Sequence, residues 1–300
     1  MLLSQEFQNF IAQLRANPVP FDQLTDIGEL RATFDALGRD RPPLPDVMFQ
    51  PVDAAGVPAE WVEPTGSDPS RVIFYLHGGG YVAGDPVVYR NVVTALCRAS
   101  GYRALMVDYR LAPEAPFPAA LDDAQRSYAW LLTQGISADQ IVIIGDSAGG
   151  GLALSTLVSL REGGQPLPGA AVVLSPWTDL TLQSESHLTK VKDDPIITRK
   201  FLDLSRQHYI GTGASDTDAL VSPLYADLKG LPPLLVLVGT AEVLFDDSAA
   251  LVRKAREAGV DVELIKGDGM IHTWPFFIDS FPEAAKAVQR IGTYIHSRVR

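Results

Sequence analysis

The sequence is poor in cysteine and poor in positive charge. Cys97 is the single cysteine among 300 residues, which excludes an intramolecular disulfide and a cysteine-based zinc site. Acidic residues outnumber basic ones by 36 to 25, for a net charge of −11, and no lysine–arginine cluster interrupts this excess. A basic surface for nucleic acid is therefore not expected. The acidity is typical of a soluble protein; steering of a cationic substrate is the second interpretation.

Long apolar runs are also missing. No run approaches the length of a bilayer-spanning helix, so we expect no membrane insertion. The first residues lack the basic and apolar stretches of a signal peptide, and we expect a soluble, cytoplasmic protein. Hydrophobic residues still make up 46% of the chain, enough for a large core. Cys97 lies in an apolar helical pattern and is expected to be a core residue.

Strand and helix patterns alternate along most of the chain. This alternation predicts an α/β fold with a mostly parallel central sheet and helices on both faces. The strand patterns cover residues 71–76, 102–107, 141–144, 170–174, 234–238 and 261–265. The helical patterns cover residues 87–99, 117–133, 148–161, 246–258 and 282–297. Two earlier runs, 47–52 and 60–63, are expected to be antiparallel edge strands.

Two segments interrupt this alternation. Residues 1–45 hold helical patterns at 2–16 and 28–37, followed by a proline-rich break. Residues 178–224 are polar and too long for a simple loop. We expect one domain, in which residues 178–224 form an inserted, mostly helical cap.

The segment Gly145-Asp146-Ser147-Ala148-Gly149 fits the pattern G-x-S-x-G, which is weak by itself. Here it directly follows an apolar strand pattern and opens a helix rich in small residues. A serine at such a strand-to-helix turn is held in strained backbone geometry that presents its hydroxyl to a substrate carbonyl. The helix N-terminus favours the negative charge that develops there. Ser147 is therefore the expected nucleophile.

A serine nucleophile of this kind needs a histidine base that comes late in the chain, after the acid. His272 and His296 are the histidines that come late enough. His296 lies inside the last helical pattern and is expected on its surface. His272 follows a strand pattern in a glycine-rich loop, where catalytic side chains of parallel sheets are found. We expect His272 to be the base.

The acid that orients the base should follow the strand pattern 234–238. Glu242, Asp246 and Asp247 are the candidates. Glu242 lies nearest the strand end, whereas the two aspartates begin a helix, where N-terminal capping is an alternative role. We favour Glu242 and leave the aspartates as alternatives.

The loop His77-Gly78-Gly79-Gly80 follows an earlier strand pattern. Glycine N–H groups can approach a substrate oxygen closely, because no side chain stands in the way. We expect the N–H groups of Gly79, Gly80 and Ala148 to form the oxyanion hole. Gly78 is expected to shape the turn and His77 to anchor the loop by side-chain hydrogen bonds.

Together these motifs resemble the hormone-sensitive-lipase-like branch of the α/β hydrolases, also called bacterial family IV esterases. The matching segments lie in the family's order at 77–81, 107–114, 117–120, 145–150, 222–224 and 270–272. The family's serine, oxyanion glycines and histidine carry over onto Ser147, Gly79, Gly80 and His272. The family usually has D-P-L-x-D after the late strand. This chain reads Glu242-Val243-Leu244-Phe245-Asp246 there, which puts Glu242 at the acid position.

The resemblance implies hydrolysis of small esters with short to medium acyl chains. It also implies that residues 1–45 and about 178–224 form the cap over the site, on a catalytic core of residues 46–300. No metal or cofactor is expected. Members of this branch are often dimeric, so a homodimer is compatible with it. Lactone or amide hydrolysis, or a non-catalytic receptor on the same fold, are the alternatives. Aromatic and leucine side chains near the cap are candidate pocket walls, with ordinary core packing as the alternative: Leu3, Phe7, Phe10, Tyr81, Trp177 and Tyr209.

Overall fold

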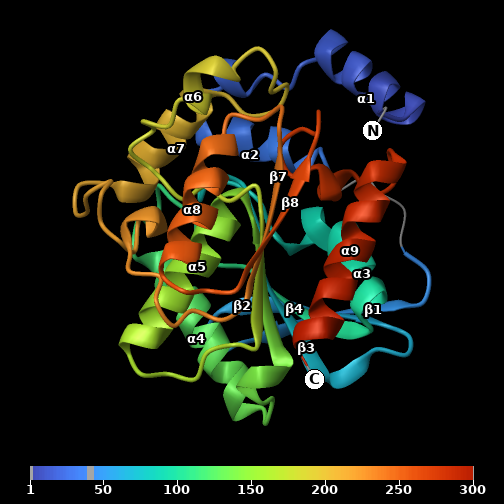
Figure 1. The fold of residues 1–300 in the computed structure, drawn as a ribbon, viewed down its shortest axis with the longest axis vertical. Coiled ribbons are helices and arrows are strands. Elements are labelled where there is room, and N and C mark those ends of the chain that lie inside the picture. Colours follow the sequence, from blue (N-terminus) through green and yellow to red (C-terminus); the bar gives the residue numbers. More distant parts are fainter. Residues whose placement is uncertain (1–2, 39–43, 300) are drawn as a thin grey trace.

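The computed structural model describes residues 3–38 and 44–299, and it is built on one eight-stranded sheet (Figure 1). The strand order is β1-β2-β4-β3-β5-β6-β7-β8. The neighbours from β4 to β8 pair in parallel, whereas β1 pairs with β2 and β2 with β4 in antiparallel fashion. The strands are β1 (Val47–Asp53), β2 (Pro58–Pro64), β3 (Asp68–Leu76), β4 (Tyr102–Val107), β5 (Ile141–Asp146), β6 (Ala170–Leu174), β7 (Leu234–Gly239) and β8 (Val262–Gly267).

Helices cover both faces of the sheet, as the alternation predicted. On one face lie α4 (Ala119–Thr133), α5 (Ser147–Glu162) and α8 (Phe245–Glu257), and on the other α3 (Pro86–Ser100) and α9 (Pro282–Arg298) (Figure 1). Each predicted strand and helix of the core is present, with bounds that differ by a few residues. No helix in the described part of the chain is long and apolar enough to cross a membrane.

The central strands are apolar along their length because both of their faces are covered. In β5, Ile141 and Ile143 join the core on the α4–α5–α8 face, whereas Val142 and Ile144 join the core on the α3–α9 face. Successive strand side chains point to opposite faces, so a continuous apolar run serves two cores at once. Each such buried side chain contributes about 1.5–3 kcal/mol relative to an exposed one. Cys97 is buried and free in the second core, as predicted.

The two segments that interrupt the alternation lie together at one end of the sheet (Figure 1). The first holds α1 (Gln5–Ala16) and α2 (Ile27–Asp35), and the second holds α6 (Ser186–Thr189) and α7 (Arg199–Ile210). Residues 178–224 are less helical than expected, because much of this stretch is loop stabilised by side-chain-to-backbone hydrogen bonds. The predictions for residues 1–2 and 39–43 lie outside the described residues.

Arg31 fastens α2 to the core. Its guanidinium donates to both carboxylate oxygens of Glu114, at 2.9 and 2.7 Å. It also donates to the carbonyl oxygens of Val82 at 2.8 Å and Ala112 at 3.0 Å. The ion pair is partly exposed and contributes ~0.2–1 kcal/mol, so the two carbonyl contacts give the attachment its specificity. Val82 belongs to the loop after β3, and α2 is thus connected directly to that loop.

Candidate active site

Ser147 lies at the sharp turn between β5 and α5, with its side chain almost entirely buried. Its φ of +52° is in the left-handed region, which is strained for a non-glycine residue. The turn is tight because Gly149 approaches the strand beside β5. A Cβ on Gly149 would stand 2.1 Å from the carbonyl oxygen of Leu76. The elbow predicted from the sequence is therefore present, with its serine at the carboxyl end of the sheet.

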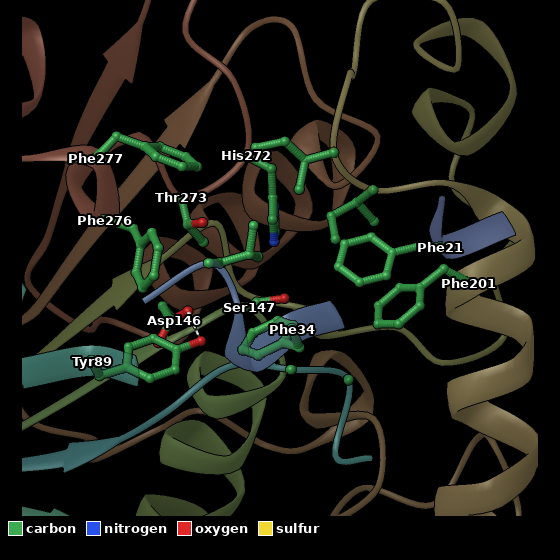
Figure 2. Close-up of a pocket in the computed structure, with 15 residues that line it drawn as sticks. Phe21, Phe34, Tyr89, Asp146, Ser147, Phe201, His272, Thr273, Phe276 and Phe277 are labelled. Atoms are coloured by element: carbon green, nitrogen blue, oxygen red, sulfur yellow. Dashed lines mark hydrogen bonds between the residues drawn. The ribbon is translucent and has the colours of Figure 1, made fainter. Parts of the chain in front are cut away.

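His272 and Glu242 form a buried pair at the same end of the sheet. His272 Nδ1 lies 2.8 Å from Glu242 Oε2, and the two side chains are 3% and 0% exposed. An ionised carboxylate only accepts hydrogen bonds, so the imidazole donates from Nδ1 and Nε2 is left able to receive a proton. In Figure 2 the His272 ring is directed toward Ser147. Among the described residues, Ser147 Oγ has no hydrogen-bond partner and is free to engage a substrate or the base.

The charge state of His272 depends on two opposing effects. Burial opposes protonation, but the hydrogen bond and the negative charge of Glu242 outweigh it and raise the imidazole pKa above its ordinary value. Asp194 and Asp146 act in the same direction as Glu242. The arrangement therefore stabilises an imidazolium, the species that forms when a base takes a proton from a serine.

The alternative acids, Asp246 and Asp247, bind other residues. Asp246 accepts from the Ser186 N–H at 2.7 Å. Asp247 is fully buried and accepts from the backbone N–H groups of Thr178 and Asp179, at 3.1 and 3.0 Å, while His187 Nε2 lies 3.1 Å from its other oxygen. The capping role considered for these aspartates is wrong, because both bind residues 178–187 instead. Glu242 is the carboxylate that contacts His272.

The glycine loop after β3 borders the same cavity as Ser147. Gly79 has a φ of +115°, and a Cβ there would stand 2.1 Å from the Ala83 carbonyl oxygen. Its carbonyl accepts from the N–H groups of Val82 and Ala83, which closes the loop. Among the described residues, the Gly79 and Gly80 N–H groups have no acceptor within the protein. Ala148 occupies the first turn of α5, where N–H groups also lack helical partners.

His77 supports this loop mainly by packing. Its ring stacks on Tyr109 at 4.2 Å between centroids, and its Nδ1 lies 2.8 Å from the Gly78 carbonyl oxygen. Burial lowers the pKa of His77 to about 4, so the ring is neutral near pH 7. The hydrogen-bond anchor predicted for His77 is thus a single contact to the neighbouring residue. His296 lies exposed on α9, as predicted.

Asp146 borders the cavity at Ser147, a position that the sequence patterns did not single out. It is buried beside Ser147 and accepts from the Gly78 N–H and the Tyr75 hydroxyl, both at 2.9 Å. A Cβ on Gly78 would stand 2.4 Å from this carboxylate, which explains why the turn needs glycine. Burial raises the pKa of Asp146 to about 6, although these hydrogen bonds and His272 favour the charged form. Its place inside the G-x-S-x-G segment was the available signal.

Ser175 is the second position that was missed. It follows β6 with a φ of +46°, and its hydroxyl donates to Glu242 Oε1 at 2.9 Å. The Ser175 hydroxyl oxygen also accepts from the Thr273 N–H, at 3.0 Å. A polar residue directly after a central parallel strand was the signal that could have found it.

A narrow apolar cavity of about 40 Å³ opens at Ser147 and His272 (Figure 2). Both interrupting segments contribute walls, and so does the stretch after His272. The apolar side chains that line it are Phe21, Phe34, Leu37, Tyr89, Ile196, Ile197, Phe201, Phe276 and Phe277. None of the six wall residues proposed from the sequence is among the lining residues.

Those six side chains pack in other parts of the molecule. Tyr81 stacks on Tyr209 at 3.7 Å, Phe7 packs edge-on against Phe281 at 4.9 Å, and Phe10 contacts Phe277 at 4.8 Å. Trp177 is fully buried in the core, and Leu3 lines a separate surface hollow beside β8 and α9. The prediction was wrong because aromatic residues dominate cores as well as pockets, and composition does not separate the two.

Known proteins that resemble this chain are hydrolases of the same fold. A family model described as alpha/beta hydrolase fold matches residues 73–276. The acetyl-hydrolase of Streptomyces hygroscopicus is 41% identical over 239 residues, which cover 80% of this chain and 79% of that protein. An esterase of Acinetobacter venetianus is 37% identical over 268 residues, covering 89% and 88%.

Solved structures extend the likeness to the whole chain. An esterase from the bacterial hormone-sensitive lipase (HSL) family superposes with a TM-score of 0.94 at 40% identity, covering 100% of both chains. A hormone-sensitive lipase from a metagenome library gives 0.92 at 36% identity, covering 97% of this chain and 98% of that one. The chain therefore belongs to the hormone-sensitive-lipase-like branch of the α/β-hydrolase family and is a carboxylic ester hydrolase.

Proposed function

We propose that this esterase works by two-step acyl transfer, with Ser147 as nucleophile, His272 as base and Glu242 as the acid that orients it. One observation carries the proposal. The His272 imidazole is held at Nδ1 by Glu242, 2.8 Å away, while its ring is directed toward the strained serine at the β5–α5 turn (Figure 2). A serine hydrolase needs this arrangement, in which the acid orients the base and the base faces the nucleophile.

In the first step His272 Nε2 takes the proton of Ser147 Oγ as that oxygen attacks the ester carbonyl. The N–H groups of Gly79, Gly80 and Ala148 donate to the resulting oxyanion. The tetrahedral species collapses, the bond to the alkoxy oxygen breaks, and the alcohol leaves with the proton from His272. A water molecule then gives a proton to His272 and attacks the acyl-enzyme, which releases the acid and restores the serine hydroxyl. No metal or cofactor takes part.

The size of the cavity supports a short acyl group as the preferred substrate. A volume of about 40 Å³ is far below the ~300–1,000 Å³ of pockets for larger ligands. Apart from Asp146, Ser147, His272 and Thr273, the lining side chains are aromatic or aliphatic, which suits an alkyl chain better than a charged group. We therefore place acetyl and other short esters ahead of medium-chain ones. The same machinery would act on activated lactones or amides, and these remain the alternative substrates.

We further propose that the two interrupting segments, 1–45 and about 178–224, act as a cap. Phe21, Phe34 and Leu37 reach the cavity from the first segment, and Ile196, Ile197 and Phe201 reach it from the second. Residence in the cytoplasm is supported by the single cysteine, which is buried and free. A homodimer is proposed on the family resemblance, and sedimentation velocity of the purified chain tests it.

The decisive experiment removes the nucleophile. Ser147→Ala should abolish turnover of p-nitrophenyl acetate, a loss of roughly 10⁴-fold or more. Ser159→Ala, in the same helix α5, is the matched control and should keep full activity. An alkyl phosphonate should label the wild-type protein once, at Ser147, and should leave Ser147→Ala unlabelled. Persistent turnover by purified Ser147→Ala would refute the nucleophile, and an unreactive wild-type chain would favour a non-catalytic receptor.

A further inference from the structure

Asp194 is a buried carboxylate that lies outside the proposed Ser147–His272–Glu242 machinery. It occupies the loop between α6 and α7, and it is 5% exposed. Oδ1 accepts from the backbone N–H groups of Ile196 at 2.9 Å and Ile197 at 3.0 Å. Oδ2 accepts from the N–H of Val243 at 3.0 Å. A single side chain thus joins two segments that lie 49 residues apart.

The three residues that donate to Asp194 all lie at or beside the candidate active site. Ile196 and Ile197 line the cavity at Ser147. Val243 directly follows Glu242, the residue that holds His272. The carboxylate therefore fixes one wall of the cavity against the turn that carries the acid.

Asp194 also acts on His272 through its charge. Its hydrogen-bond partners are backbone N–H groups rather than a lysine or arginine, so its charge is not neutralised by an ion pair at those contacts. Burial raises the pKa of Asp194 to about 6, while His272 and the three N–H groups favour its ionised form. A buried carboxylate is costly to keep, and apolar packing would be the simpler way to fill this site.

We propose that Asp194 is a positioning residue for ester hydrolysis, which holds the Glu242 turn and the cavity wall in register and stabilises the imidazolium of His272 by its negative charge. This inference rests on the proposed roles of Ser147, His272 and Glu242. The ionisable groups that act on His272 are Glu242, Asp194 and Asp146, which come from the turn after β7, the loop between α6 and α7, and the end of β5. Of these three, only Asp194 comes from the segment proposed as the cap. Through Asp194, that segment acts on the charge of His272.

The negative charge of Asp194 and its hydrogen bonds have effects that can be measured separately. Neutralising Asp194 removes one of the negative charges that raise the His272 pKa, so the base becomes neutral at lower pH. It also weakens the imidazolium that forms as Ser147 is deprotonated, which lowers kcat. A residue that served folding alone would change the amount of folded protein and leave the pH profile of the folded enzyme in place.

The test compares Asp194→Asn with Asp193→Asn. Asp193 is the neighbouring residue, its side chain is 51% exposed, and it contacts Lys190 at the surface. Each enzyme is counted by phosphonate titration, so that rates refer to folded, competent sites. Asp194→Asn should lower kcat on p-nitrophenyl acetate on the order of tenfold to a hundredfold, and should move the acidic limb of kcat/KM to lower pH. Asp193→Asn should match the wild type in both.

An Asp194→Asn enzyme with wild-type kcat and an unmoved acidic limb would overturn the inference. If this variant does not fold, Asp194→Ser is measured instead, since its hydroxyl still accepts from a backbone N–H but carries no charge. The same shift is expected of it, and the same null result would count against the inference. Ser147→Ala is assayed in parallel: activity in that variant rejects the proposed function, whereas its inactivity beside an unaffected Asp194→Asn rejects only the role of Asp194.

Discussion

Ser175 and Glu242 are joined by a 2.9 Å hydrogen bond from the serine hydroxyl to Oε1, the carboxylate oxygen that does not contact His272. The same hydroxyl accepts from the N–H of Thr273, the residue after the histidine, at 3.0 Å. Glu242 and the loop that carries His272 therefore share one partner, Ser175, which directly follows β6. The Ser175 hydroxyl therefore holds Glu242 and the His272 loop in a fixed relative position, and this leads to the first prediction.

Ser175→Ala should lower kcat on the order of tenfold with little change in KM. The substitution leaves the Thr273 N–H without its acceptor and takes one donor from the buried carboxylate, so the pair loses its alignment. Steady-state kinetics with a chromogenic acetate ester measure the change. Ser127→Ala is the matched control, because Ser127 is equally buried and its hydroxyl has no partner among the described residues. Equal kinetics for the two variants would contradict the prediction.

The acid assignment is tested by comparing Glu242→Gln with Asp247→Asn. Glu242→Gln should lower kcat by roughly 10²–10⁴-fold, because the imidazole loses the charge that stabilises its protonated form. Asp247→Asn should leave kcat per folded site unchanged. It should instead reduce the free energy of unfolding by about 1–3 kcal/mol, since the amide nitrogen that replaces Oδ1 can no longer accept from the Ser184 hydroxyl or from an N–H of His187. Kinetics and urea denaturation of both variants separate the effects. A larger kcat loss in Asp247→Asn would reverse the assignment.

The acidic limb of the pH profile follows from the His272 pKa. Only the neutral imidazole can take the serine proton, so kcat/KM should rise with pH as His272 loses its proton. Because Glu242 raises that pKa above the ordinary 6.5, the limb should lie above 6.5 in the wild type. Glu242→Gln removes a negative charge that offsets the effect of burial on His272. The His272 pKa should therefore fall, and the acidic limb should move to lower pH. Rates are measured with acetate ester from pH 5 to 9, corrected for active-site concentration. A limb that is unmoved in Glu242→Gln would show that another group controls it.

Two glycines with positive φ allow the effect of backbone strain to be measured apart from the effect of moving the Gly79 loop. Gly79→Ala should reduce kcat/KM on the order of 10²–10³-fold, because a Cβ 2.1 Å from the Ala83 carbonyl forces the loop and its N–H groups to move. Gly66 is the matched control: its φ is +89°, and a Cβ there meets nothing within 4 Å. Gly66→Ala should cost only the strain of a positive φ, about 1 kcal/mol of stability, with unchanged kinetics. Similar kinetic losses in both variants would argue against an oxyanion role for the loop.

If the proposed cavity receives the acyl group, its walls should set the chain-length preference. Phe201→Leu enlarges the cavity, and it should raise the kcat/KM of a hexanoate ester relative to the acetate by roughly tenfold. Phe74→Leu, in a core position away from the cavity, should lower stability without changing that ratio. The ratio is measured with matched p-nitrophenyl esters. A wild-type enzyme that already prefers hexanoate would contradict the short-chain proposal.

The sequence by itself determined the order of the core elements and the candidate nucleophile. Continuous apolar runs such as Ile141–Ile144 are local signals, because a strand buried on both faces must be apolar at every position. The elbow at Ser147 is local too, since the same few residues build the strand, the turn and the helix. Chain order left His272 and His296, and the position of His272 in a loop after a strand favoured it. Distance from a strand end favoured Glu242 over the aspartates.

Only the tertiary structure decided which carboxylates surround the histidine and which side chains line the cavity. Asp194 and Glu242 lie far apart in sequence, and no local pattern tells that the first binds the residue beside the second. Tyr81 and Phe201 are both buried aromatic residues, yet one stacks within the core and the other borders the cavity. The reason is physical: a hydrophobic side chain gains the same from burial in either place, so its location is settled by how separate segments pack and not by its own chemistry.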